Sequence, residues 1–203
     1  MIAIVDYGVG NLFSLSASLA HLGLDSTVTA DPEKIRSADQ IILPGVGAFG
    51  DAMDKLTSTG LVPLLKEQAQ QKPLLGICLG MQLLFEQSSE YGTHQGLGLI
   101  PGKVEPLLPQ VEPLGLKVPH MGWNQLQIQR PDPFLKYFRN GEYVYYVHSF
   151  YATGCQDYLL AQSPYGVQVP GLVKNGKVYG AQFHPEKSGD AGLRLLRAFG
   201  ELV

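Results

Sequence analysis

A cysteine between two glycines is the strongest chemical signal in the sequence. The segment GICLG, residues 76–80, joins an apolar stretch typical of a strand to a helical pattern. This is the usual setting of a nucleophile elbow, in which small neighbours let strand and helix approach closely. The positive end of the helix favours the thiolate of Cys78, and the N–H of Leu79 is placed to bind an oxyanion. We predict a nucleophile, against the alternative of a structural buried cysteine.

A histidine and a glutamate that could assist this nucleophile stand near the C-terminus. The segment FHPE, residues 183–186, closes the last apolar stretch. Residues two apart on an extended chain point to the same side, so Glu186 can fix one ring nitrogen of His184 while the other addresses the sulfur. The alternative is a structural histidine followed by a solvated glutamate. Both segments end strands, which favours a common location at the carboxyl edge of a sheet.

A third segment, PGVGAFG at residues 44–50, contains three glycines directly after another apolar stretch. Such a backbone can turn an N–H toward a neighbouring site, as a second oxyanion donor requires. Taken alone, the segment also fits an ordinary flexible loop. The other cysteine, Cys155, has no glycines beside it, and we expect it to be structural.

The elements that position these residues follow from the pattern of apolar residues. In the first half, strands predicted at 2–5, 26–29, 40–43 and 73–77 alternate with helical patterns, one of which we expect to be capped by Asn11. A helix is expected over 81–87, directly after the elbow. Parallel strands need such crossover connections, so the pattern predicts a parallel sheet with helices on both faces.

From about residue 96 the pattern changes to short strands. We expect strands at 124–129, 142–147, 158–161, 171–174 and 178–183, with Asn175-Gly176 as a hairpin turn before the last one. A final helix is predicted over 189–202. The predicted fold class is α/β, a mostly parallel but mixed sheet flanked by helices, as one domain over residues 1–203.

Composition excludes several classes of protein. The 203 residues carry 15 Lys and Arg against 18 Asp and Glu, a net charge of −3, without the basic excess of a nucleic-acid surface. Two cysteines imply no disulfide framework, and free thiols favour the cytoplasm. No apolar run is long enough for a membrane span, and the N-terminus does not resemble a signal peptide. No metal-ligand cluster or P-loop is visible, so we expect no cofactor.

Six segments together resemble the class I, triad-type glutamine amidotransferases. They cover nearly the whole sequence: DYGVGNL at 6–12, PGVGAF at 44–49, GICLGMQ at 76–82, PHMGWN at 119–124, YVHSFY at 146–151 and QFHPEKS at 182–188. Within this family the details are most similar to the glutaminase subunits of imidazole glycerol phosphate synthases. The resemblance implies hydrolysis of glutamine to glutamate and ammonia through a cysteine thioester.

The resemblance also implies roles for individual residues. Cys78 would be the nucleophile, His184 the general base and acid, and Glu186 the carboxylate that orients it. The N–H groups of Leu79 and, after a loop movement, Val46 would hold the oxyanion.

Two sets of residues would hold the ends of the substrate. Gln82 and Glu90 would contact the α-amino group of glutamine, and the backbone of His148, Ser149 and Phe150 would receive its α-carboxylate.

A partner is implied as well, because free ammonia is protonated in water and the sequence offers no site for an acceptor. The first two glycines of a phosphate-binding loop stand at Gly8 and Gly10, but Phe13 occupies the third position. The resemblance implies a heterodimer with a (β/α)8-barrel cyclase subunit that makes imidazole glycerol phosphate and aminoimidazole carboxamide ribotide in histidine biosynthesis. Asn11, Trp123 and Lys187 are the candidate residues of its interface.

Three alternatives stay open at this point. The glutaminase subunit of pyridoxal phosphate synthase has a similar size and mechanism, but its Gly-Gly-Glu-Ser loop and Cys-Ala-Gly elbow differ from residues 44–50 and 78–80. A non-catalytic relative would have no need for Cys78, His184 and Glu186 together. A hydrolase acting alone would share the elbow and would need no surface for a partner.

Overall fold

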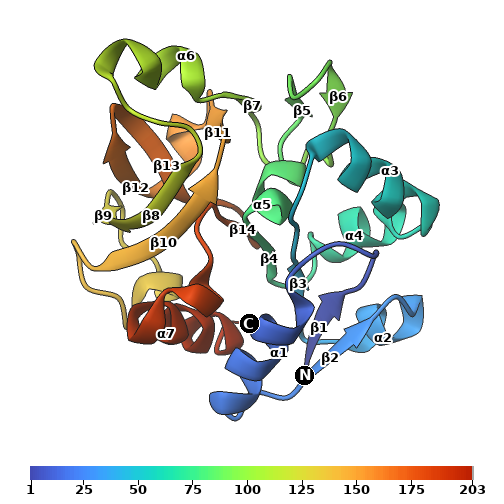
Figure 1. The fold of residues 1–203 in the computed structure, drawn as a ribbon. Helices are drawn as coiled ribbons and strands as arrows, with labels where there is room; N and C mark the ends of the chain where they lie inside the picture. The colour runs from blue at the N-terminus through green and yellow to red at the C-terminus, as the bar shows by residue number, and fades with distance from the viewer. Residues whose placement is uncertain (203) are drawn as a thin grey trace.

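A computed structural model describes residues 1–202. Its centre is an eight-stranded sheet in the order β2-β1-β3-β4-β14-β13-β12-β9 (Figure 1). The first five strands in this order, from β2 to β14, pair in parallel. The remaining three, β13, β12 and β9, pair in antiparallel fashion. The predicted mixed α/β fold is therefore confirmed. The strands are β1 Ile2–Val5, β2 Ser26–Thr29, β3 Gln40–Leu43, β4 Leu74–Ile77, β9 Gln127–Ile128, β12 Leu159–Tyr165, β13 Val167–Asn175 and β14 Val178–Ala181.

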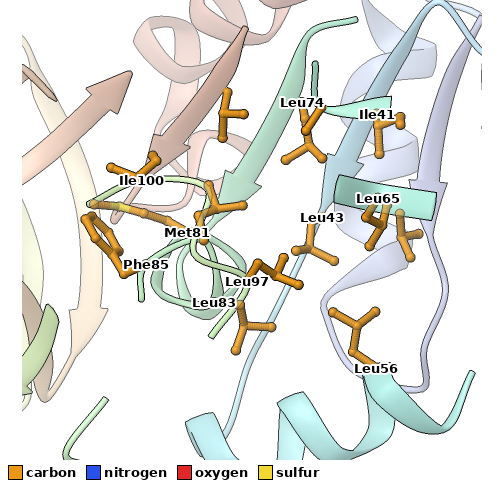
Figure 2. Close-up of a cluster of buried hydrophobic side chains, with 14 of the residues drawn as sticks. Ile41, Leu43, Leu56, Leu65, Leu74, Met81, Leu83, Phe85, Leu97 and Ile100 are labelled. Carbon is orange, nitrogen blue, oxygen red and sulfur yellow. The ribbon is translucent and has the colours of Figure 1, made fainter. Parts of the chain in front are cut away.

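Strands β1, β3, β4 and β14 are buried on both faces, which explains their continuous apolar sequences. In β1, Ile2 and Ile4 pack with helices α1 and α7, whereas Ala3 and Val5 pack with α3, α4 and α5 on the opposite face. Figure 2 shows the cluster on the face of Ala3 and Val5, in which leucines from strands and helices pack around Met81 of α5. Each fully buried Leu or Ile contributes about 1.5–3 kcal/mol relative to its exposed state.

The helices are α1 Leu12–His21, α2 Pro32–Ser37, α3 Phe49–Ser58, α4 Val62–Gln68, α5 Leu79–Leu83, α6 Leu108–Val111 and α7 Gly189–Gly200. Short 3₁₀ turns lie at η1 Glu112–Leu114, η2 Pro133–Leu135, η3 Gln156–Tyr158 and η4 Pro185–Lys187. None of the helices in this described part of the sequence is both long and apolar enough to cross a bilayer.

Two local expectations about the helices are wrong. The helix after the elbow ends at Leu83 instead of continuing to Gln87, because the N–H of Leu97 occupies the Leu83 carbonyl and the chain turns into a short strand. Asn11 precedes α1, but its side chain makes no capping hydrogen bond. An apolar helical pattern is not sufficient to continue a helix when tertiary contacts take its carbonyl groups.

Two smaller sheets complete the carboxyl edge of the main sheet. Strands β8 His120–Gln125 and β10 Tyr143–His148 form an antiparallel pair, and β11 Phe150–Thr153, β7 Lys103–Pro106, β5 Gln87–Ser88 and β6 His94–Gln95 form a four-stranded sheet in that order. The predicted hairpin between β13 and β14 is present, with Gly176 at φ +58° in its turn. Gly176 and Lys177 are its two loop residues, one position later than expected.

Candidate active site

The elbow predicted around Cys78 is present. Cys78 lies between β4 and α5 with φ 55° and ψ −114°, a conformation that a non-glycine residue adopts only under strain. Its side chain is buried, and the sulfur approaches the carbonyl oxygen of Val147 at 3.8 Å. The surrounding structure thus holds the thiol in one direction.

The glycines of the elbow are required by space. A Cβ on Gly76 would lie 2.5 Å from the carbonyl oxygen of Gly80, and a Cβ on Gly80 would lie 1.9 Å from that of Leu43. The loop after β3 packs equally closely, since a Cβ on Gly45 would lie 2.6 Å from the Gly80 nitrogen. Two glycine-rich segments far apart in the sequence therefore touch backbone to backbone.

His184 lies at the same edge, after the end of β14. Its ring nitrogen Nδ1 is 2.8 Å from Oε1 of Glu186, and both side chains are nearly inaccessible to solvent. The 3₁₀ turn η4 contains Glu186, and the backbone N–H of His184 donates to the carbonyl of Tyr145. The ring is thereby fixed from both sides.

The charges around His184 favour its protonated form. Burial by itself lowers the pKa of the ring, but hydrogen bonds to Cys78 and Glu186, together with their negative charges, outweigh burial and raise the pKa to about 9. A protonated imidazole next to the sulfur stabilises a thiolate. Because α5 has only five residues, its dipole is short.

A cavity of about 330 Å³ opens beside the sulfur. It is lined by Val46, Gly47, Cys78, Leu79, Gln82, Glu90, Pro119, Val147, His148, Ser149, Phe150 and His184. This lining includes every predicted catalytic, oxyanion and substrate residue except Glu186, which contacts His184. The volume is at the small end of ligand pockets and suits a ligand of amino-acid size.

Gln82 is a buried amide on the cavity wall whose orientation is determined by its partners. Its Nε2 donates to the carbonyl of Phe150 at 3.0 Å and to Oε1 of Gln182 at 3.1 Å. Both amide hydrogens are therefore used, and the oxygen of Gln82 is the atom left to accept a hydrogen bond from a ligand.

Glu90 places a carboxylate on the same wall. Its Oε2 accepts the N–H of Phe49 at 2.7 Å, and its own N–H donates to Ser88. Burial raises the pKa of Glu90, partly offset by the Phe49 hydrogen bond. A positively charged ligand group would favour the ionised form of Glu90, so this wall favours an ammonium group.

The loop that contains Val46 is held at both ends. The hydroxyl of Tyr7 donates to the carbonyl of Pro44 at 2.7 Å, and Glu90 holds Phe49 at the start of α3. Between these contacts Val46 is exposed at the cavity, and Gly47 has φ +98°. The loop thus has fixed ends and a glycine that permits the peptide between them to rotate.

Two of the three predicted interface residues, Asn11 and Lys187, lie beside Glu186. Asn11 and Glu186 line one small cavity, Lys187 follows Glu186 and is exposed, and Trp123 lies on β8 with 55% of its surface exposed. Whether they bind a partner stays a prediction. Cys155 is buried away from this edge, and burial raises the pKa of its thiol to about 11.

Sequence reasoning missed three polar residues that support the site. Gln182 holds the amide of Gln82, Tyr7 holds the loop of Val46, and His120 hydrogen-bonds to His148. The alternation of β14 could have indicated Gln182, which lies two residues before His184. The contacts of Tyr7 and His120 depend on long-range packing.

Comparisons with known proteins show which family this chain is similar to. The family model for glutamine amidotransferase class-I matches residues 3–201. The imidazole glycerol phosphate synthase subunit HisH of Listeria monocytogenes serotype 4a is 53% identical over 100% of this chain and 96% of that protein. The same subunit of Caldanaerobacter subterraneus is 47% identical over 100% and 98%. The structure of PurLQS from Thermotoga maritima has the same fold, with a TM-score of 0.75 at 20% identity over 98% of this chain and 96% of that one.

Proposed function

This chain belongs to the glutamine amidotransferase class-I family, and from that premise we propose that it is the glutaminase subunit of an imidazole glycerol phosphate synthase. The observation that carries the proposal is that Cys78 and His184, which is held by Glu186, line one small cavity whose wall also contains polar Gln82 and Glu90. The full-length similarity to synthase subunits supports this function over the alternatives of a pyridoxal phosphate synthase subunit and a non-catalytic relative.

The substrate is glutamine, which is held by its α-ammonium and α-carboxylate groups. Its ammonium group binds the oxygen of Gln82 and the carboxylate of Glu90, and its carboxylate accepts hydrogen bonds from the backbone of His148, Ser149 and Phe150. The side-chain amide then reaches Cys78. A ligand without the α-amino group leaves the buried carboxylate of Glu90 without a cationic partner, which disfavours binding of that ligand.

The reaction has two steps. The thiolate of Cys78 attacks the amide carbon, and the N–H groups of Leu79 and Val46 stabilise the oxyanion. His184, protonated below a pKa of about 9, gives its proton to the departing nitrogen, which leaves as ammonia with a glutamyl thioester behind. His184 then takes a proton from water, which attacks the thioester and releases glutamate and the thiolate. Glu186 keeps Nδ1 of the ring occupied throughout.

The ammonia passes to a (β/α)8-barrel cyclase subunit, in a heterodimer that makes imidazole glycerol phosphate and aminoimidazole carboxamide ribotide. Asn11, Trp123 and Lys187 belong to the interface, next to the site where ammonia forms. Exposed Val46 and Gly47 are where the partner changes the oxyanion loop, so the isolated chain is a poor glutaminase. The nucleophile must remain a free thiol, which fits a reducing cytoplasm.

Replacing the nucleophile tests this proposal. We expect the complex with Cys78→Ser to lose glutamine-dependent synthesis by at least about 10³-fold, because the serine hydroxyl is not ionised by His184. Synthesis from added ammonium salt should survive, since the cyclase site is unchanged. Cys155→Ser is the matched control and should keep both activities. Equal loss of both activities in Cys78→Ser would contradict the assigned role.

A further inference from the structure

A buried pair of histidines lies behind the cavity wall, outside the catalytic residues. His120 on β8 and His148 on β10 are directly opposite each other in the antiparallel pair. Nδ1 of His120 is 2.9 Å from Nε2 of His148, and both residues are buried. Only His148 lines the cavity.

The direction of each hydrogen bond in this pair can be assigned. The carbonyl of Phe150 can only accept, so Nδ1 of His148, 2.9 Å away, carries the hydrogen. Burial lowers the pKa of His148 to about 3 and that of His120 to about 4, so both rings are neutral at pH 7. Nε2 of His148 therefore accepts from Nδ1 of His120. Nε2 of His120 in turn accepts from the amide of Asn124 at 3.3 Å.

The carbonyl of Phe150 is where this series of hydrogen bonds meets the substrate site. It accepts from His148 and also from Nε2 of Gln82, at 2.9 and 3.0 Å. The position of this one oxygen thus affects the amide of Gln82 and the backbone of residues 148–150 together. In the proposed function, Gln82 binds the α-ammonium group of glutamine and the backbone of residues 148–150 binds its α-carboxylate.

The ring of His120 is held firmly. It is stacked between Tyr146 and Tyr165, with ring centroids 4.6 and 3.9 Å away and interplanar angles of 22° and 21°. Its neighbours on β8, Met121 and Trp123, are exposed at 61% and 55%. The same short strand therefore presents an outer face to solvent and an inner face to the cavity wall.

We propose that His120 is a positioning residue for the substrate site. Through its hydrogen bond to His148 it fixes the carbonyl of Phe150 and the amide of Gln82, and so sets the affinity for the amino-acid end of the substrate without acting on the chemistry at Cys78. This inference rests on the proposed glutaminase function.

Two reagents that react with Cys78 test the assignment on the complex with the cyclase subunit. Iodoacetamide needs only the thiolate, whereas 6-diazo-5-oxo-L-norleucine must also bind through its α-amino and carboxyl groups. In His120→Phe, which keeps the stacking but removes both nitrogens, we expect the half-saturating concentration of the glutamine analogue to rise about tenfold. The iodoacetamide rate should stay within about twofold. Mass spectrometry of the peptide that contains Cys78 measures both rates.

A pair of conservative variants separates positioning from a purely structural role. His120→Asn places an amide nitrogen near the position of Nδ1, and the analogue should bind within about threefold of wild type. His120→Gln places it near Nε2 and should weaken binding about tenfold. This pair carries the test if His120→Phe folds poorly. Gln40→Leu removes another buried amide, at the opposite edge of the sheet, and should change neither rate.

Unchanged analogue binding in His120→Phe and His120→Gln would overturn the assignment, and so would an equal slowing of both reagents. A wild-type complex in which iodoacetamide labels Cys78 but the analogue does not would overturn the proposed function itself. If the analogue labels wild type and the His120 variants equally well, only the present inference is overturned.

Discussion

Two histidine sites at one cavity have opposite electrostatics. His184 and His148 are both buried, yet the pKa of His184 is raised to about 9 and that of His148 is lowered to about 3. Burial lowers both pKa values. The difference arises because His184 contacts a thiol and a carboxylate, whereas His148 contacts a second histidine and a carbonyl. The partners of a buried histidine therefore decide whether it transfers protons or only donates a fixed hydrogen bond.

The largest effect that tests this difference is expected from Glu186→Gln. The amide cannot stabilise the imidazolium of His184, so we expect the turnover number for glutamine to fall roughly 10³-fold. Steady-state kinetics of the complex measure the loss of turnover. The melting temperature of the chain is the control that shows whether the variant is still folded. A fall of less than tenfold, with the fold intact, would show that Glu186 is not the orienting carboxylate.

The same variant has a second readout in the pH dependence of stability. The pKa of His184 in the folded chain, about 9, exceeds its ordinary value of 6.5. Its contribution to the free energy of unfolding is therefore complete below pH 6.5 and is lost as the pH rises toward 9. We expect wild type to lose on the order of 1–3 kcal/mol over this range, and Glu186→Gln to lose less. Parallel curves in urea unfolding would contradict the role of the carboxylate.

The His120–His148 pair predicts a pH dependence of opposite sign. Its pKa values lie below 6.5 in the folded chain, so the stability it allows is complete above pH 6.5 and is lost as the pH falls toward 4. We expect wild type to lose roughly 2–4 kcal/mol from this source, and His120→Phe to lose about half as much. Urea unfolding between pH 7 and 4.5 compares the two. An equally steep decline in both would mean that other groups cause it.

The sequence predicted well those parts of the molecule that depend on local chemistry. The elbow at Cys78 and the segment containing His184 and Glu186 were located because strained turns, strand ends and alternation leave residue signatures at short range. The central parallel strands β1, β3 and β4 are predictable from their continuous apolar stretches. In these segments, local preference and final structure agree.

The rest could not be predicted because it depends on contacts between distant segments. Gln82 and Gln182 are 100 residues apart, and only the pairing of β14 with β4 brings their elements together. Helix α5 ends early because the Leu83 carbonyl accepts the N–H of Leu97. The contact of His120 with His148 depends on the pairing of β8 with β10. Trp123 and His120 belong to the same segment, and alternation alone does not say which face of β8 is buried.

The central claim is that glutamine forms a thioester with Cys78, and trapping that intermediate tests it most directly. The complex is mixed with glutamine, quenched in acid during turnover, and its peptides are analysed by mass spectrometry. We predict a glutamyl adduct on the peptide that contains Cys78, removable by hydroxylamine and absent from the peptide that contains Cys155. Release of ammonia with no adduct on Cys78, or with the adduct on Cys155, would contradict the account.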